Sequence, residues 1–185
     1  MDDLQSIRRL KNGDIGGLEV LITCYQIKAV RTAYLVTQDE HMAEDVVQEA
    51  FIRFYERLRY FDETRPFGPY FLRSVVNRAL NAVEKEHGAV SLDDDLDTPT
   101  MQTLLDHAIS VETQMEYAQL KAEISRMLET LSPRQRAAVV LRYYLEMSEK
   151  EMTETLNVAP GTVKWLLNAA RSRLRILLNS ERIPE

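Results

Sequence analysis

The stretch that decides the fold is SEKEMTETLNVAPGTVKWLLNAARSRLR, residues 148–175. Ser148, followed three residues later by Glu151, has the pattern of a capping box, in which two side chains satisfy backbone N–H groups at the start of a helix. Asn157 tolerates the left-handed conformation that a sharp turn needs, and Pro160 suits the first turn of a second helix. The stretch therefore predicts two short helices joined by a tight turn.

The second of these helices has two contrasting faces. Apolar residues at helical spacing predict an inward stripe of Val163, Leu167, Ala170 and Leu174. A polar stripe on the free side contains Lys164, Asn168, Arg171 and Arg175. Arginine can bind guanine edges in the major groove and lysine can hold phosphates. Taken alone, however, these charges are more often explained by the solvated face of a surface helix. The capping box, the turn residue and the basic face together favour a DNA-binding helix-turn-helix.

The rest of the chain also reads as helices. One stripe at steps of three and four residues predicts a buried helix face, formed by Ala43, Val47, Ala50, Phe54 and Leu58. Ser132 and Pro133 have the order of an N-cap and a first helical residue. Strand-like alternation is nearly absent, so an all-α fold is expected. The predicted helices span residues 17–36, 39–61, 65–86, 111–131 and 134–146.

Charged residues are distributed unevenly along the chain. The formal net charge is −6, but residues 87–116 contain seven acidic residues and neither lysine nor arginine. This composition indicates a flexible acidic linker at residues 89–113, with one short helix at residues 101–108. We therefore predict two helical domains, residues 1–88 and residues 114–185, of which the second carries the helix-turn-helix.

Several classes of function are disfavoured by the sequence. No apolar run is long enough to span a membrane, and the N-terminus has no apolar signal core. The lone cysteine, Cys24, fits a reducing cytoplasm. His41, His87 and His107 lie far apart without the paired spacing of metal ligands, and no phosphate loop, dinucleotide motif or nucleophile elbow occurs. We expect neither an enzyme nor a metal or other cofactor, and a cytoplasmic location.

Four ordered motifs in the C-terminal half, LSPRQR, LRYYLEMS, EMTETLN and PGTVK, resemble the last domain of bacterial sigma factors. The similarity is greatest to the extracytoplasmic-function (ECF) class, which keeps only two domains. In the N-terminal half, AEDVVQEAFIRFYER and YFLRSVVNRALN resemble two helices of the first domain of the same class. The resemblance covers nearly the whole chain.

The resemblance implies an alternative sigma factor that binds core RNA polymerase, directs it to promoter DNA and opens the DNA near the start site. It places polymerase contacts at Asp45, Gln48, Glu49 and Arg53. It places DNA contacts in the first domain at Tyr70, Arg73, Asn77, Arg78 and Lys85, and adds Thr162 to the basic stripe of the second domain. It also implies an inhibitory anti-sigma protein as a further partner.

The sequence departs from the family pattern at several positions. Asn81, Glu84 and Glu86 stand where the family usually has an aspartate followed by cations, which should weaken strand opening. Trp165 and Leu166 stand where serine and arginine are frequent, and Asn168 and Ala169 stand in place of a second serine and arginine, so two cations should be missing from the groove-facing set. We expect Trp165 to pack on a neighbouring helix or, alternatively, against a partner. Two other functions stay open from the sequence: a helix-turn-helix regulator that acts without polymerase, and a degenerate sigma-like interaction module.

Overall fold

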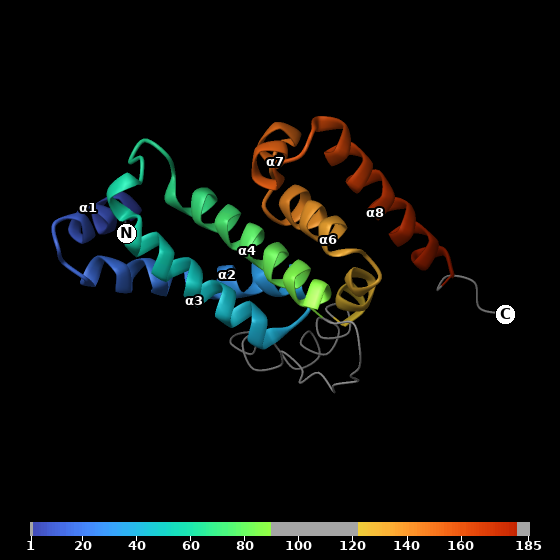
Figure 1. The fold of residues 1–185 in the computed structure, drawn as a ribbon, viewed down its shortest axis with the longest axis horizontal. Helices are drawn as coiled ribbons and strands as arrows, with labels where there is room; N and C mark the ends of the chain where they lie inside the picture. The colour runs from blue at the N-terminus through green and yellow to red at the C-terminus, as the bar shows by residue number, and fades with distance from the viewer. Residues whose placement is uncertain (1, 90–121, 181–185) are drawn as a thin grey trace, which may run out of the picture. The chain divides into compact units, whose positions relative to one another are not determined.

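The computed structural model describes residues 2–89 and 122–180 of the 185-residue chain. Every regular element in these two stretches is helical, which confirms the predicted all-α class (Figure 1). The chain divides into two compact units, Met1–Glu86 and His87–Glu185. From residue 90 onward the predicted linker lies outside the described residues, as does the short helix predicted at residues 101–108. None of the described helices combines the length and the apolar character needed to cross a bilayer.

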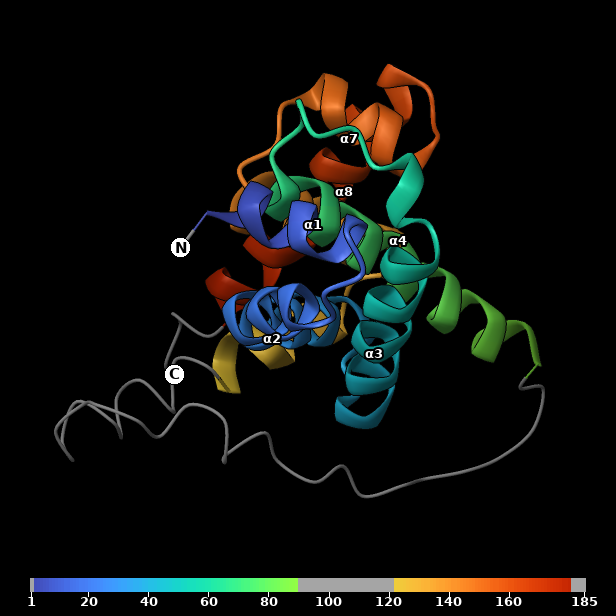
Figure 2. The same cartoon turned by 90° about the vertical axis from the view of Figure 1, so that its left-hand side faces the viewer.

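Within residues 2–89, the first unit consists of four helices and one short 3₁₀ turn, with the hairpin of the second and third helices between the first and the fourth. Its elements are α1 (Asp3–Lys11), α2 (Gly16–Thr37), α3 (Glu40–Glu56), the 3₁₀ turn η1 (Leu58–Tyr60) and α4 (Phe67–Ala89). Gln38 ends α2 in the left-handed conformation, with φ 60°, and Asp39 caps α3 by accepting a hydrogen bond from the Met42 amide. The chain therefore reverses within two residues, and α2 and α3 lie side by side (Figures 1 and 2).

The predicted stripe of α3 is buried, but the helix is shorter than predicted. All five stripe residues are buried. Arg57 leaves the helical region, with φ −101° and ψ 10°, so α3 ends at Glu56 instead of continuing to residue 61. The tighter turn η1 follows and brings Phe61 into an aromatic cluster that joins α3 to α4. The rings of this cluster belong to Phe51, Phe54, Phe61, Phe67 and Phe71.

The sequence reasoning missed α1. Asp2 caps this helix, and Ile7 and Leu10 are buried on one side of it. The signals of an amphipathic helix are therefore present in a segment for which we predicted no helix. The α1 backbone meets α2 closely: a Cβ atom on Gly17 would lie 2.2 Å from the carbonyl oxygen of Ser6. Only glycine fits at such an approach of two helices.

A second contact fixes α1 to α2. The hydroxyl of Tyr25 donates a hydrogen bond to the carboxylate of Asp3. Burial and this hydrogen bond both raise the pKa of Tyr25, so the phenol stays protonated and keeps its donor. The lone cysteine, Cys24, is exposed one residue away.

The second unit contains the helix-turn-helix. Residues 122–129 are helical, followed by α6 (Pro133–Val139), the π-helical turn η2 (Val140–Tyr144), α7 (Glu149–Leu156) and α8 (Pro160–Ser180). Both predicted helix starts are confirmed, since Ser132 pairs with Gln135, and Ser148 with Glu151, in complete capping boxes. Asn157 has φ 50° and ψ 50°, which confirms the predicted left-handed turn between α7 and α8.

The structure differs from the prediction after Val139. The helix predicted at residues 134–146 changes there from α-helical to π-helical hydrogen bonding, and the Leu145 amide donates to the Val140 carbonyl at 3.0 Å. A π turn accommodates one more residue than an α turn and is frequent at functional sites. Of the predicted inner stripe of α8, Val163, Leu167 and Ala170 are buried, whereas Leu174 is half-buried.

Candidate nucleic-acid interface and docking face

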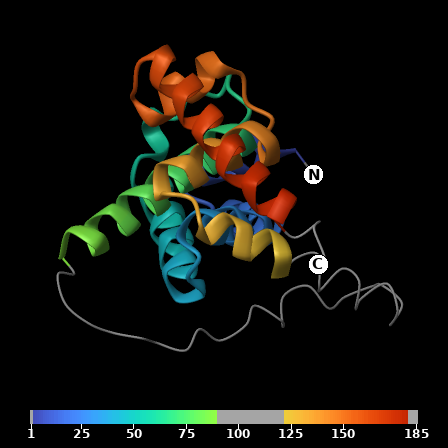
Figure 3. The same ribbon diagram turned by 90° about the vertical axis from the view of Figure 1, so that its right-hand side faces the viewer.

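The polar stripe of α8 is an exposed surface. Lys164, Asn168, Arg171 and Arg175 are all exposed, and Thr162 is half-buried in the first turn of the helix. Figure 3 shows α8, in red, as the long helix that follows the short α7. The Lys164 ammonium lies 4.0 Å from the Glu149 carboxylate of α7, and both side chains are largely solvated. A pair this loose and exposed contributes little, so a phosphate can replace the carboxylate.

One arginine of the stripe is held in place by a residue that sequence reasoning missed. Arg171 Nε donates a hydrogen bond to the hydroxyl oxygen of Tyr143 at 2.8 Å, and Arg171 Nη1 lies 3.4 Å from Asn168 Oδ1. Tyr143 belongs to the π turn η2 and is 57% exposed. Two elements of the unit therefore orient one guanidinium, and the two residues are 28 positions apart in the chain.

Two substitutions relative to the family pattern behave differently from expectation. Leu166 is 3% exposed and belongs to the core, so it does not take the place of a groove-facing cation. Trp165 is 63% exposed, so the prediction that its ring packs on a neighbouring helix is wrong. Successive residues of a helix are about 100° apart, which is why the adjacent Trp165 and Leu166 face solvent and core respectively.

The predicted polymerase face on α3 is also exposed. Asp45, Gln48, Glu49 and Arg53 all lie outside the buried stripe. Glu49 Oε1 is shared by two guanidinium groups, at 2.9 Å from Arg53 and at 3.0 Å from Arg78 of α4. Desolvation acts to raise the pKa of Glu49, but the hydrogen bond from Arg53 and the charge of Arg78 outweigh it and lower the pKa. This face is therefore a mixed ion-pair network as well as an acidic patch.

The predicted DNA contacts on α4 have mixed exposure. Arg73, Asn77 and Arg78 are half-buried, and Lys85 is exposed. Tyr70 is 37% exposed, and its ring centroid lies 5.0 Å from that of Phe61 at an edge-on angle. Part of the Tyr70 ring thus contributes to the core, and the remaining part is available to a ligand. Arg78 joins this set to the polymerase face through Glu49, a link that the sequence did not reveal.

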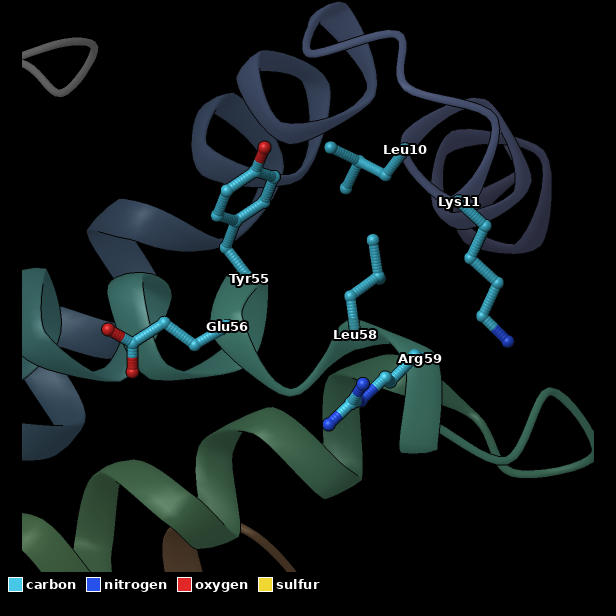
Figure 4. Close-up of a pocket in the computed structure, with 6 residues that line it drawn as sticks. All are labelled: Leu10, Lys11, Tyr55, Glu56, Leu58 and Arg59. Atoms are coloured by element: carbon cyan, nitrogen blue, oxygen red, sulfur yellow. The ribbon is translucent and has the colours of Figure 1, made fainter.

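The first unit contains a hollow that is lined by six residues. Its walls come from α1, the end of α3 and η1 (Figure 4), and its lining residues are Leu10, Lys11, Tyr55, Glu56, Leu58 and Arg59. Lys11 is already held by the Glu63 carboxylate at 2.8 Å and by the Phe61 carbonyl. Within residues 2–89 and 122–180, no group of three or more histidine, cysteine, aspartate or glutamate side chains could hold a metal ion.

Each half of the chain matches a region of known sigma factors. Residues 21–88 match Sigma-70 region 2, and residues 121–174 match Sigma-70 region 4. The ECF RNA polymerase sigma factor SigW of Bacillus subtilis is 29% identical over 173 residues, which cover 91% of this chain and 92% of SigW. The RNA polymerase sigma-E factor of Streptomyces avermitilis is 30% identical over 171 residues, which cover 92% of this chain and 90% of the relative.

Two solved structures share the fold. CnrH, in complex with the cytosolic domain of CnrY, has a TM-score of 0.63 at 20% identity and covers 96% of this chain and 97% of its own. The sigma factor RpoE from Bartonella quintana, in complex with the anti-sigma factor NepR, has a TM-score of 0.61 at 19% identity, with 89% and 98% covered. Together with the sequence relatives and both matched regions, these findings show that the chain belongs to the ECF class of RNA polymerase sigma factors, the initiation factors that direct promoter recognition.

Proposed function

We propose that this alternative sigma factor docks on core RNA polymerase through α3 and reads promoter DNA through α8. The observation that carries the proposal is the presence of region 2 and region 4 in one chain, each with an exposed polar helix face at the positions that the family motifs occupy. Sigma factors are non-enzymatic initiation factors. We therefore infer that this chain has no catalytic activity of its own and needs no cofactor.

The docking face is Asp45, Gln48, Glu49 and Arg53. Asp45 and Glu49 are four residues apart on α3, so their carboxylates share one side of the helix. An acidic patch of this kind complements a basic partner helix. The Glu49 network adds rigidity, because Arg53 and Arg78 both hold Oε1 of this carboxylate before any partner binds.

The promoter face is Thr162, Lys164, Asn168, Arg171 and Arg175. About 16 Å of helix separates Lys164 from Arg175, more than the roughly 12 Å width of the major groove. The N-terminal part of α8 can therefore reach base edges while Arg171 and Arg175 meet the phosphate backbone. Three cations on one exposed stripe supply the affinity for DNA, and docking on polymerase raises the effective concentration.

The α4 residues form the third set, for the strand that opens near the start site. The exposed part of the Tyr70 ring offers a surface on which an unpaired base can stack. Arg73, Asn77, Arg78 and Lys85 lie on the same helix and can hold the strand. Glu84 and Glu86 flank Lys85 and repel phosphates, so we expect this set to bind weakly.

We propose a division into domains at residues 1–88 and 114–185 with residues 89–113 as the linker, and a cytoplasmic location where polymerase and DNA are found. We also propose an anti-sigma protein as the inhibitory partner. Its support is that both structural neighbours were solved in complexes, one of them with a protein named as an anti-sigma factor.

Reconstitution with core polymerase followed by mapping of transcript starts tests the function. We expect defined start sites on genomic DNA; holoenzyme that forms but starts no transcript would favour the degenerate module. A chain that binds DNA but not polymerase would instead be a regulator, an outcome that the region 2 match disfavours.

Paired substitutions test the two faces separately. Asp45→Asn with Glu49→Gln should abolish co-purification with core polymerase, whereas Glu56→Gln, an exposed acid at the end of the same helix, should not. Lys164→Ala with Arg171→Ala should abolish promoter-specific transcription while the holoenzyme still forms. Arg173→Ala removes one positive charge from the other side of α8 and serves as the control for each of the two single substitutions.

A further inference from the structure

We propose that Trp165 is a specificity residue that contacts the C5-methyl group of a thymine in the upstream promoter element, by which we mean the duplex segment that α8 reads. The proposal rests on the proposed function of α8 and assigns a role to a residue outside the basic stripe. Its starting point is the 63% exposure of a tryptophan on the recognition helix, which leaves most of this residue open to solvent.

The direction of Trp165 supports a groove contact. The buried residues Val163, Leu166, Leu167 and Ala170 define the inward direction of α8. The outward direction is opposite to the mean direction of these four buried residues. At about 100° per residue, Asn168 and Trp165 each lie about 30° from the outward direction, on opposite sides of it, whereas Lys164 lies about 70° from it. Of the large side chains in this part of the helix, Trp165 and Asn168 point most directly outward.

The position of Trp165 along the helix gives the same result. It is the sixth residue of α8, between Lys164 and Asn168. The N-terminal residues of a recognition helix contact base edges, and later residues pass beyond the groove. Trp165 therefore lies in the part of α8 that can reach bases.

The chemistry of the groove selects the contact. Thymine carries the C5-methyl group in the major groove, and apolar side chains recognise thymine by touching it. Trp165 presents a flat apolar ring beside the amide of Asn168, and amides of this kind pair with adenine. We therefore expect A·T pairs at adjacent positions of the element.

A protein partner fits this surface less well. An apolar docking patch needs several contiguous apolar residues. The helix neighbours of Trp165 are Gly161, Thr162, Asn168 and Ala169, of which Ala169 is small and half-buried. The next large exposed apolar residue on this side, Ile176, is about 16 Å farther along the axis. A lone aromatic ring among cations and amides is better suited to a polyanion with methyl groups in its groove.

Replacement of thymine by deoxyuridine tests the contact, because it removes the methyl group alone. Holoenzyme would be titrated with promoter duplexes in which each thymine of the upstream element, on either strand, is replaced in turn. Burial of one methyl group corresponds to about fourfold in affinity, so we expect about a fourfold loss at one or two adjacent positions. Trp165→Ala holoenzyme should bind thymine and deoxyuridine duplexes equally, and Ile176→Ala should keep the wild-type pattern.

Three outcomes would overturn the proposal. The wild type could be indifferent to every replacement, Trp165→Ala could retain the wild-type pattern, or Trp165→Ala could bind all duplexes normally and lose a protein partner. Failure of the proposed function is separately visible, because no holoenzyme–promoter complex would then form with any duplex.

Discussion

Replacement of Tyr143 by phenylalanine should weaken promoter binding without changing its salt dependence. The substitution removes only the hydroxyl group that accepts the 2.8 Å hydrogen bond from Arg171. The guanidinium keeps its charge but loses the contact that orients it. Because the tyrosine is neutral, the number of phosphates neutralised by the protein stays the same.

The magnitude follows from the exposure of the pair. A hydrogen bond contributes about 0.5–1.5 kcal/mol net, and the low end applies where solvent competes. Arg171 and Tyr143 are both exposed, so we expect a loss of about two- to fivefold in promoter affinity. Arg171→Ala should cost more and should also reduce the slope of log K against log salt by about 0.9, because one phosphate contact disappears.

Holoenzyme binding to a promoter duplex, measured over a series of salt concentrations, separates these effects. In the Arg171→Ala background, adding Tyr143→Phe should change nothing further, because the acceptor has lost its donor. An equal loss in both backgrounds would mean that the hydroxyl acts on DNA directly. Unchanged or increased affinity in Tyr143→Phe alone would also refute a positioning role.

Three further predictions concern stability, each measured by unfolding of the full chain. Gly17→Ala should destabilise by about 1–3 kcal/mol, because the new Cβ would lie 2.2 Å from the Ser6 carbonyl oxygen; a wild-type urea midpoint would contradict this close approach. Ser148→Ala should cost about 1 kcal/mol in urea unfolding and Ser148→Asp much less, since aspartate also caps; equal losses would exclude capping as the cause. Glu49→Gln should lower the melting temperature at neutral pH. The pKa of Glu49 is lowered in the folded state, so the difference in melting temperature between wild type and variant should persist at pH values above 4.5, the ordinary pKa of glutamate. The difference should vanish as the pH falls through the folded-state pKa. A difference that stays constant with pH would exclude the ionised pair with Arg78.

The features that sequence predicted well are those decided within a few residues. The capping box of Ser148 and Glu151 and the left-handed turn at Asn157 depend only on local hydrogen bonds and dihedral angles. The buried stripe of α3 follows from helical periodicity in the same way. Local patterns also indicated the long helices, although α1 was not predicted and α3 ends earlier than predicted.

The features that sequence did not predict depend on contacts between distant residues. Arg78 meets Glu49, and Arg171 meets Tyr143, across 29 and 28 positions of the chain, and no local pattern marks either pair. Trp165 is a different case. We predicted that Trp165 packs on a neighbouring helix, but its outward direction could have been calculated from the helix period, which places Leu166 in the core and Trp165 in solvent.

The π turn at Val140–Tyr144 makes chain length, and not only residue identity, a determinant of how Arg171 of the proposed promoter face is held. A single-residue deletion there would restore ordinary helical winding and swing Tyr143 by about 100°, out of reach of Arg171. Two relatives with identical recognition helices would then differ in their affinity for DNA because one of them lacks a residue in this turn. Insertions and deletions in this turn are therefore an evolutionary route to retuned promoter affinity that leaves every base-reading side chain unchanged.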